Sequence, residues 1–122
     1  MRLASDEFVI TVHKLHRMSV IIVRGALDLT NIHVLADAVD HIVYREVPLL
    51  LDLTGVRCID SAGLHFIRQV HDQCAGKHVP FAMVANATVR RLCGLLSLET
   101  VIPIFANRTL ARDHFVAEWG AH

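Results

Sequence analysis

One segment of the sequence restricts the fold more than any other. Residues 49–55, read as LLLDLTG, follow Pro48 and are apolar almost throughout. A strand that is apolar on both faces is typical of the interior of a parallel sheet whose two faces are covered by helices. The segment therefore predicts a central strand in a domain that mixes α-helices with a largely parallel sheet.

The sequence before this strand predicts a hairpin. Residues 8–16 alternate apolar and polar side chains, which is the pattern of a strand with one buried face. Residues 19–27 form a second apolar, β-branched run, and only a few residues centred on Arg17 separate the two runs. We therefore expect the chain to open with two antiparallel strands.

Helical and extended segments alternate through the rest of the chain. Apolar residues recur every three or four positions where helices are expected, and Asp28, Thr30 or Asn31 can cap the first of them. The expected elements are a helix over residues 31–45, the strand 49–55, a helix from Ser61 that stops at Gly76, a strand over 79–85, a helix capped by Asn86, a strand over 101–105, and a closing helix with apolar positions Leu110, Ala111, Phe115 and Trp119. This order predicts an α/β fold with right-handed crossovers between parallel strands.

Length and charge limit the classes of function. The chain has 122 residues, which suits one domain, and 12 basic side chains balance 12 acidic ones, so no net charge draws it to nucleic acid. No apolar run reaches the roughly 18 residues of a membrane span, and the start MRLASDEF is too short and acidic for a signal peptide. We expect a cytoplasmic protein that binds another protein and neither nucleic acid nor a membrane.

The histidines and cysteines do not form a recognisable site. The 9 histidines lack the spacing of a zinc or metalloprotease motif, and no phosphate-cradling sequence is present, so neither a metal nor a cofactor is expected. The three cysteines, Cys58, Cys74 and Cys93, are an odd number at wide spacing, which suits neither a disulfide framework nor a CxxC zinc or redox site. We expect them to be buried as small apolar residues, and a redox role stays open.

The segment CIDSAGL, residues 58–64, is the candidate site. It follows the central strand, and loops beyond the carboxyl ends of strands are where an open α/β sheet meets its ligands. Asp28 lies on the corresponding loop after the second strand. Ser61 opens a helix, where free N–H groups favour a negative group, so it could accept a phosphate. Alternatively, Ser61 or Asp60 only caps the helix, which contributes about 1 kcal/mol.

A third interpretation, a serine nucleophile, is disfavoured. The nucleophile elbow of hydrolases needs glycine where this chain has Ile59, and no oxyanion loop is present. Asp113 and His114 follow in the order of a triad, and His65 could approach the Ser61 hydroxyl from one turn away. Without the other roles, the protein is expected not to be an enzyme.

Three segments resemble a known family. RGALD (24–28), LLLDLTGVRCIDSAGLHFI (49–67) and ATVRRL (87–92) closely resemble the STAS domain, in the group of bacterial anti-sigma factor antagonists. The match to D-S-[SA]-G-L after an apolar strand is the most specific part. The resemblance implies a single STAS domain over residues 1–122, with a core of 8–116, and a mixed sheet of about five strands with about four helices.

The resemblance also implies a non-enzymatic switch. Family members bind an anti-sigma factor, which is a serine kinase of the histidine-kinase-like ATPase type, and so release a sigma factor. The kinase phosphorylates the serine after the aspartate, here Ser61, and a serine phosphatase reverses the reaction. By the same resemblance, Asp28, Asp60, Ala62 and Gly63 join Ser61 in the partner-binding surface.

Two departures and one alternative accompany the resemblance. Ala62 stands where the family often has a second serine, which leaves one acceptor hydroxyl, and Ser97 stands where a glycine is common after the third helix. Other family members are subunits of transporter complexes. The alternative function is therefore a STAS subunit that docks on the ATPase of a phospholipid transport complex.

Overall fold

The computed structural model describes residues 8–15 and 17–119. In chain order the elements are β1 (Val9–Leu15), β2 (Met18–Leu27), α1 (Ile32–Tyr44), β3 (Leu49–Ile59), α2 (Ser61–Gly76), β4 (Phe81–Ala85), α3 (Ala87–Leu95), the short 3-10 helix η2 (Leu98–Thr100), β5 (Ile104–Phe105) and α4 (Arg108–Trp119). This order confirms the α/β fold with a mixed sheet of five strands and four α-helices.

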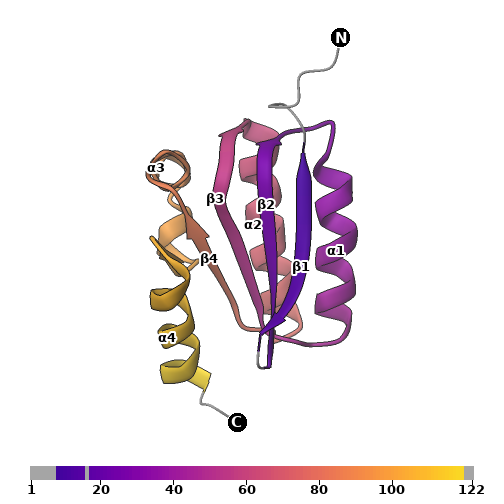
Figure 1. Cartoon of the computed structure of the whole chain (residues 1–122), viewed down its shortest axis with the longest axis vertical. Coiled ribbons are helices and arrows are strands. Elements are labelled where there is room, and N and C mark those ends of the chain that lie inside the picture. Colours follow the sequence, from indigo (N-terminus) through magenta and orange to yellow (C-terminus); the bar gives the residue numbers. More distant parts are fainter. Residues whose placement is uncertain (1–7, 16, 120–122) are drawn as a thin grey trace.

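The sheet has the strand order β1-β2-β3-β4-β5, and β3 lies in its middle as the sequence predicted (Figure 1). β1 pairs antiparallel with β2, with Leu15 opposite Met18, whereas β2, β3, β4 and β5 run parallel. Residues 49–53 of β3 are buried without exception, because helices cover both faces of this part of the sheet. The continuous apolar run of β3 is thus explained by its central place.

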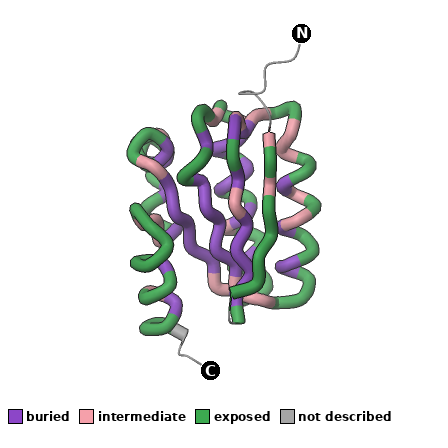
Figure 2. The backbone as a smooth tube through the Cα atoms, in the orientation of Figure 1, coloured by how far each residue is buried: buried purple, intermediate pink, exposed green. Residues whose placement is uncertain are grey.

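Helices cover the two faces of the sheet unequally. α1, α2 and α3 pack on one face, where their apolar stripes meet side chains such as Ile21, Leu51 and Met83 in the larger core. α4 packs on the other face, against a smaller cluster that includes Leu50 and Val84. Figure 2 shows the buried chain concentrated in the middle strands, while most of β1 and the outer sides of the helices are exposed.

The last strand is shorter than the sequence indicated. Residues 101–105 were expected to form it, but only Ile104–Phe105 pair with β4. The N–H of Ile102 instead donates to the carbonyl of Leu98 at 2.9 Å, which continues the turn of η2 and buries Ile102 in the core. Pairing starts only at Pro103, whose carbonyl accepts the N–H of Met83 at 2.9 Å.

After α2 and α3, the residue with left-handed backbone is not a glycine. α2 ends at Gly76 as expected, but the residue with left-handed backbone is His78, with φ of 57°. After α3, Ser97 takes the left-handed conformation with φ of 55° at the position where the family often has glycine. The carbonyl of Ser97 accepts a hydrogen bond of 2.6 Å from the Thr100 hydroxyl, which helps to hold this uncommon conformation.

Apolar contacts and an ion pair between Arg108 and Asp52 attach α4 to the sheet. Ala111 and Phe115 are buried as predicted, but Leu110 is 49% exposed and does not join the core. The side chain of Trp119 lies outside the described part of the structure. Nε of Arg108 lies 2.7 Å from Oδ2 of Asp52, a carboxylate on β3 that is 1% exposed.

The cysteines divide into two kinds. Cys74 and Cys93 are buried, as predicted, in the larger core. Cys58 is exposed, so the prediction was wrong for this residue. Its neighbour Ile59 packs against the larger core, and because successive side chains alternate along a strand, Cys58 points to the other face, beyond the cluster that α4 covers.

Candidate functional site

Two loops meet at the carboxyl edge of the sheet. β2 and β3 are parallel neighbours, and Leu27 pairs with Ile59 at their ends. The loop from β2 to α1 and the loop from β3 to α2 therefore leave the sheet side by side. This arrangement brings the loop of Asp28 next to the loop of Asp60 and Ser61. The sequence had placed each loop beyond the carboxyl end of a strand but had not made the two strands neighbours.

The carboxylate of Asp60 joins the two loops. Its Oδ1 accepts the backbone N–H of Gly63 at 2.8 Å and so caps α2. Its Oδ2 accepts the backbone N–H of Leu29, on the other loop, at 3.3 Å. The N–H of Asp60 also donates to the carbonyl of Leu27 at 3.3 Å. Asp60 is therefore a helix cap and a tether between the loops at once.

Ser61 is not the cap of α2. It is the first residue of the helix and is exposed, and its hydroxyl makes no hydrogen bond to another residue in the described ranges 8–15 and 17–119. The sequence left the cap open between Ser61 and Asp60, and the structure assigns it to Asp60. His65 does not reach the Ser61 hydroxyl either, since its Nδ1 lies 2.7 Å from the Ser61 carbonyl oxygen.

The loop of Asp28 is organised by its own side chains. The carboxylate of Asp28 accepts the backbone N–H of Thr30 at 2.9 Å and also accepts its hydroxyl. The Thr30 hydroxyl, followed by the Thr30 N–H, lowers the pKa of Asp28 below its ordinary value of 3.8, so this carboxyl is ionised at neutral pH. Asn31 occupies the cap position of α1, but its side chain makes no cap bond. It bonds instead to the N–H of Asp28 and the carbonyl of Ala26.

Gly63 allows α2 to begin close to the ends of the strands. A Cβ added at this residue would lie 2.6 Å from Cγ1 of Ile59 and 3.0 Å from the carbonyl oxygen of Leu27. A larger residue would therefore push the first turn of α2 away from the loop of Asp28. Gly63 is buried and Ala62 is half-buried, so both residues expose less of themselves around Ser61 than Asp60 and Ser61 do.

Sequence reasoning missed Leu29, whose backbone N–H donates to the Asp60 carboxylate. Its side chain is 75% exposed, although it stands between Asp28 and Thr30 in the ordered loop. The only signal in the sequence is an apolar residue inside the polar stretch D-L-T-N. Whether such a residue turns inward or outward is decided by the tertiary structure.

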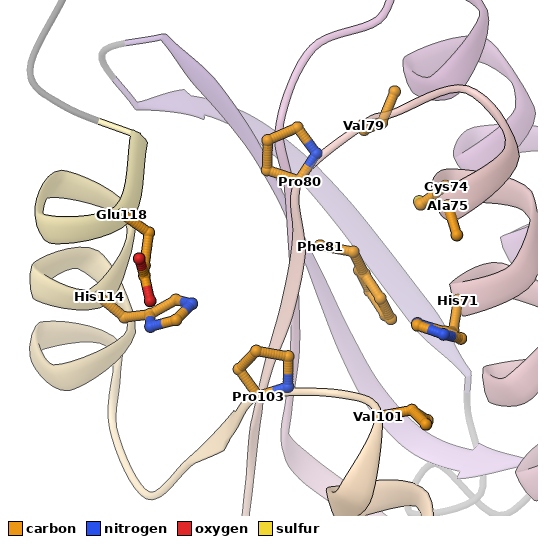
Figure 3. Close-up of a pocket in the computed structure, with 10 residues that line it drawn as sticks. All are labelled: His71, Cys74, Ala75, Val79, Pro80, Phe81, Val101, Pro103, His114 and Glu118. Atoms are coloured by element: carbon orange, nitrogen blue, oxygen red, sulfur yellow. The ribbon is translucent and has the colours of Figure 1, made fainter.

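The residues of the alternative triad are not brought to Ser61. His114 belongs to α4, and it lines a pocket of about 440 Å³ with Pro80 and Phe81 at the start of β4 (Figure 3). Ser61 lies beyond the end of β3, at the opposite edge of the sheet from the start of β4. Asp113 is also on α4, which packs on the other face from α2. The structure therefore gives no geometry for a serine hydrolase.

The described residues offer neither a metal-binding cluster nor a helix that could span a membrane. Among residues 8–15 and 17–119, no three histidine, cysteine, aspartate or glutamate side chains gather where they could hold a metal ion. Within the same ranges, none of the helices combines the length and the apolar character needed to cross a membrane.

The fold and the site together define an α/β domain with a mixed sheet, in which an antiparallel first strand precedes four parallel strands, and with an exposed serine at the start of the helix that follows the central strand. This is the architecture of the STAS domain, and the STAS family matches residues 9–111 of the chain. The protein therefore belongs to the STAS domain family. A sequence search of the curated proteins found no match.

Solved structures with the same fold include anti-sigma factor antagonists. An antagonist from Mycobacterium paratuberculosis is 26% identical, with a TM-score of 0.83 over 91% of this chain and 96% of that one. TM1081 from Thermotoga maritima is 22% identical, with a TM-score of 0.75 over 86% and 92% of the two chains. SpoIIAA from Bacillus, solved in its phosphorylated form, is 13% identical, with a TM-score of 0.68 over 87% and 98%. For TM1081 and SpoIIAA, the similarity concerns the fold alone.

Proposed function

We propose that this protein is an anti-sigma factor antagonist that is controlled by phosphorylation of Ser61. The observation that carries the proposal is that Asp60, and not Ser61, caps α2. Because Asp60 caps α2, the Ser61 hydroxyl is exposed and uncommitted to any described residue. Membership of the STAS family and the likeness to the antagonist from Mycobacterium paratuberculosis support the same function.

The proposed reaction takes place on this chain but is catalysed by its partner. The anti-sigma factor, a serine kinase of the histidine-kinase-like ATPase type, binds ATP and docks on the surface around Ser61. The γ-phosphoryl group is transferred to Oγ of Ser61, the hydroxyl proton passes to a base of the kinase, and ADP leaves. A serine phosphatase hydrolyses the phosphoserine and restores the hydroxyl. The protein itself supplies no catalytic group.

The position of Ser61 explains how one phosphate changes binding without unfolding the protein. The phosphate adds about −1.5 to −2 charges at neutral pH. At the start of α2, the helix dipole and free N–H groups favour that charge. The docking surface, however, already carries the carboxylates of Asp28 and Asp60, so a dianion placed between the two proteins meets both repulsion and a desolvation cost. The unphosphorylated form is therefore the one that binds the anti-sigma factor and releases the sigma factor.

Phosphorylation of Ser61 is tested with the kinase and labelled ATP. We expect wild type to incorporate one phosphate and Ser61→Ala to incorporate none. Thr88→Ala is the matched control, because Thr88 is an exposed hydroxyl residue in the first turn of α3, which Asn86 caps through Val89 N–H at 2.9 Å, as Asp60 caps α2. Equal labelling of Ser61→Ala and wild type would show that the acceptor is another residue.

The partner is tested by affinity capture with the unphosphorylated protein as bait. Recovery of a histidine-kinase-like ATPase together with a sigma factor regulator supports the proposal. Recovery of a transporter ATPase instead, in the absence of any such kinase, would replace it with the function of a transport-complex subunit.

A further inference from the structure

Leu29 is exposed at a place where the chain is tightly ordered. Single exposed apolar residues are common on protein surfaces and need no explanation of their own. Leu29 differs because hydrogen bonds from side chains fix the backbone on both sides of it. Asn31 Oδ1 accepts the N–H of Asp28 at 3.0 Å, Asp60 Oδ2 accepts that of Leu29 itself at 3.3 Å, and Asp28 Oδ1 accepts that of Thr30 at 2.9 Å.

This network holds the Leu29 side chain out of the core. The side chain is 75% exposed, so its apolar surface contributes little to the stability of the fold. A side chain whose backbone is already fixed loses less conformational freedom when it is buried by a partner. The geometry is therefore that of a preorganised contact residue.

Leu29 is also adjacent to the proposed phosphate acceptor. The carboxylate that holds its N–H belongs to Asp60, which precedes Ser61 in the chain, and the other arm of the same carboxylate caps α2. A kinase whose active site reaches Oγ of Ser61 must cover the loop that Asp60 holds. The partner that covers Leu29 is therefore the kinase that phosphorylates Ser61.

We propose that Leu29 is the apolar anchor of the docking surface for the anti-sigma kinase, an inference that rests on the proposed function. The partner fits it with an apolar pocket for the leucine side chain, located beside its active site. Cationic groups at the rim of that pocket face Asp28 and Asp60, the carboxylates that flank Leu29. Leu29 makes no contact with the transferred phosphoryl group, so it acts on binding and not on the chemical step.

The test compares Leu29→Ala with Leu95→Ala. Leu95 is a matched control because it is 74% exposed and belongs to α3, on the other side of α2 from α1 (Figure 1). We expect Leu29→Ala to weaken binding of the unphosphorylated protein to the kinase by about ten-fold or more, as measured by calorimetry. We expect Leu95→Ala to bind within about two-fold of wild type. Leu29→Met, which keeps an apolar side chain of similar volume, should restore most of the affinity.

Kinetics of Ser61 phosphorylation give a second readout. Leu29→Ala should raise KM for the protein substrate and leave kcat unchanged, because the acceptor hydroxyl is untouched. Thermal melting of each variant checks that the fold is retained, which the exposure of Leu29 predicts. If wild type binds and is phosphorylated but Leu29→Ala has the same affinity and KM, the inference about Leu29 fails and the proposed function stands. If wild type neither binds the kinase nor is phosphorylated by it, both fail.

Discussion

At the scale of single residues, the site depends on what the carboxylate of Asp60 does. One oxygen caps α2 through Gly63, and the other holds the backbone of Leu29. Had Ser61 been the cap, phosphorylation would have removed the cap from its own helix. Because a neighbour supplies the cap, Ser61 can gain a charged group while the first turn of α2 keeps its hydrogen bond.

Ser61→Glu tests whether charge at this position is sufficient to block binding. We expect the variant to remain folded, because the helix N-terminus favours the carboxylate, and to bind the anti-sigma factor at least about ten-fold more weakly than wild type. Ser61→Gln, of the same size but neutral, is the control and should bind more tightly than Ser61→Glu. Equal affinities of the two variants in a calorimetric titration would mean that size, and not charge, opposes the complex.

At the scale of elements, α4 is attached differently from the other helices. α1, α2 and α3 share the larger core, whereas α4 covers a small cluster and relies on Arg108. Oδ1 of the buried Asp52 carboxylate accepts the N–H of Thr54 at 2.9 Å and its hydroxyl at 2.7 Å, and Arg108 bonds to Oδ2. Without Arg108, one oxygen of a buried carboxylate would lose its partner.

Arg108→Ala is therefore expected to destabilise the protein by about 1–2 kcal/mol, a range that takes into account the 54% exposure of the Arg108 side chain. Arg112→Ala is the matched control on the same helix, because Arg112 is 49% exposed and its Nε lies 3.9 Å from the exposed Asp113. We expect a change within about 0.5 kcal/mol for the control. Urea unfolding measures both, and equal effects would contradict the role of the buried pair.

At the scale of the whole molecule, the two edges of the sheet have different characters. The carboxyl edge carries the ordered loops around Asp28 and Ser61, and the opposite edge carries the pocket between α2 and α4 at the start of β4 (Figure 3). The core between them holds two thiols, and burial raises the pKa of both Cys74 and Cys93 to about 11. For Cys93, the charge of Glu99 adds a smaller effect in the same direction.

The raised pKa of these two thiols leads us to expect that the stability of the fold decreases at alkaline pH. Their pKa is raised from the ordinary 9.0 to about 11, so the native state favours the neutral thiol and the unfolded state ionises first. The contribution of these two thiols to the free energy of unfolding is therefore fully present below about pH 9 and is lost progressively between about pH 9 and 11. At pH 10 each thiol should account for about 1 kcal/mol of that loss.

Unfolding by urea at pH 8 and pH 10 measures this loss. The variant with both Cys74→Ala and Cys93→Ala should lose less stability between the two pH values than wild type does. Cys58→Ala is the control, since Cys58 is exposed, and should keep the wild-type pH dependence. An unchanged pH dependence in the double variant would contradict the prediction.

The strands and α-helices and their order along the chain could be predicted from local sequence patterns, whereas the 3-10 helix η2 could not. The apolar run of residues 49–53 and the helical spacing after Ser61 are local patterns, and local periodicity indicates which face of an element is apolar. The alternation over residues 8–16 correctly predicted the strand β1, but the expected buried face was wrong, because most of β1 is exposed. The sequence also placed Asp28, Asp60 and Ser61 on loops beyond the carboxyl ends of strands, and the parallel pairing of β2 with β3 brings those loops together. What the pattern failed to give is the length of β5, where Pro103 and the turn of η2 decide the pairing.

The roles of Asp60 and Ser61 could not be predicted from local sequence and follow from the three-dimensional arrangement of the two loops. Serine and aspartate are both good helix caps, so the sequence could not choose between Ser61 and Asp60. The choice depends on where the oxygens of Asp60 lie relative to two backbone N–H groups, of which one comes from a loop about thirty residues earlier in the chain. The exposure of Leu29 and of Cys58 depends in the same way on neighbours distant in sequence, which no local pattern contains.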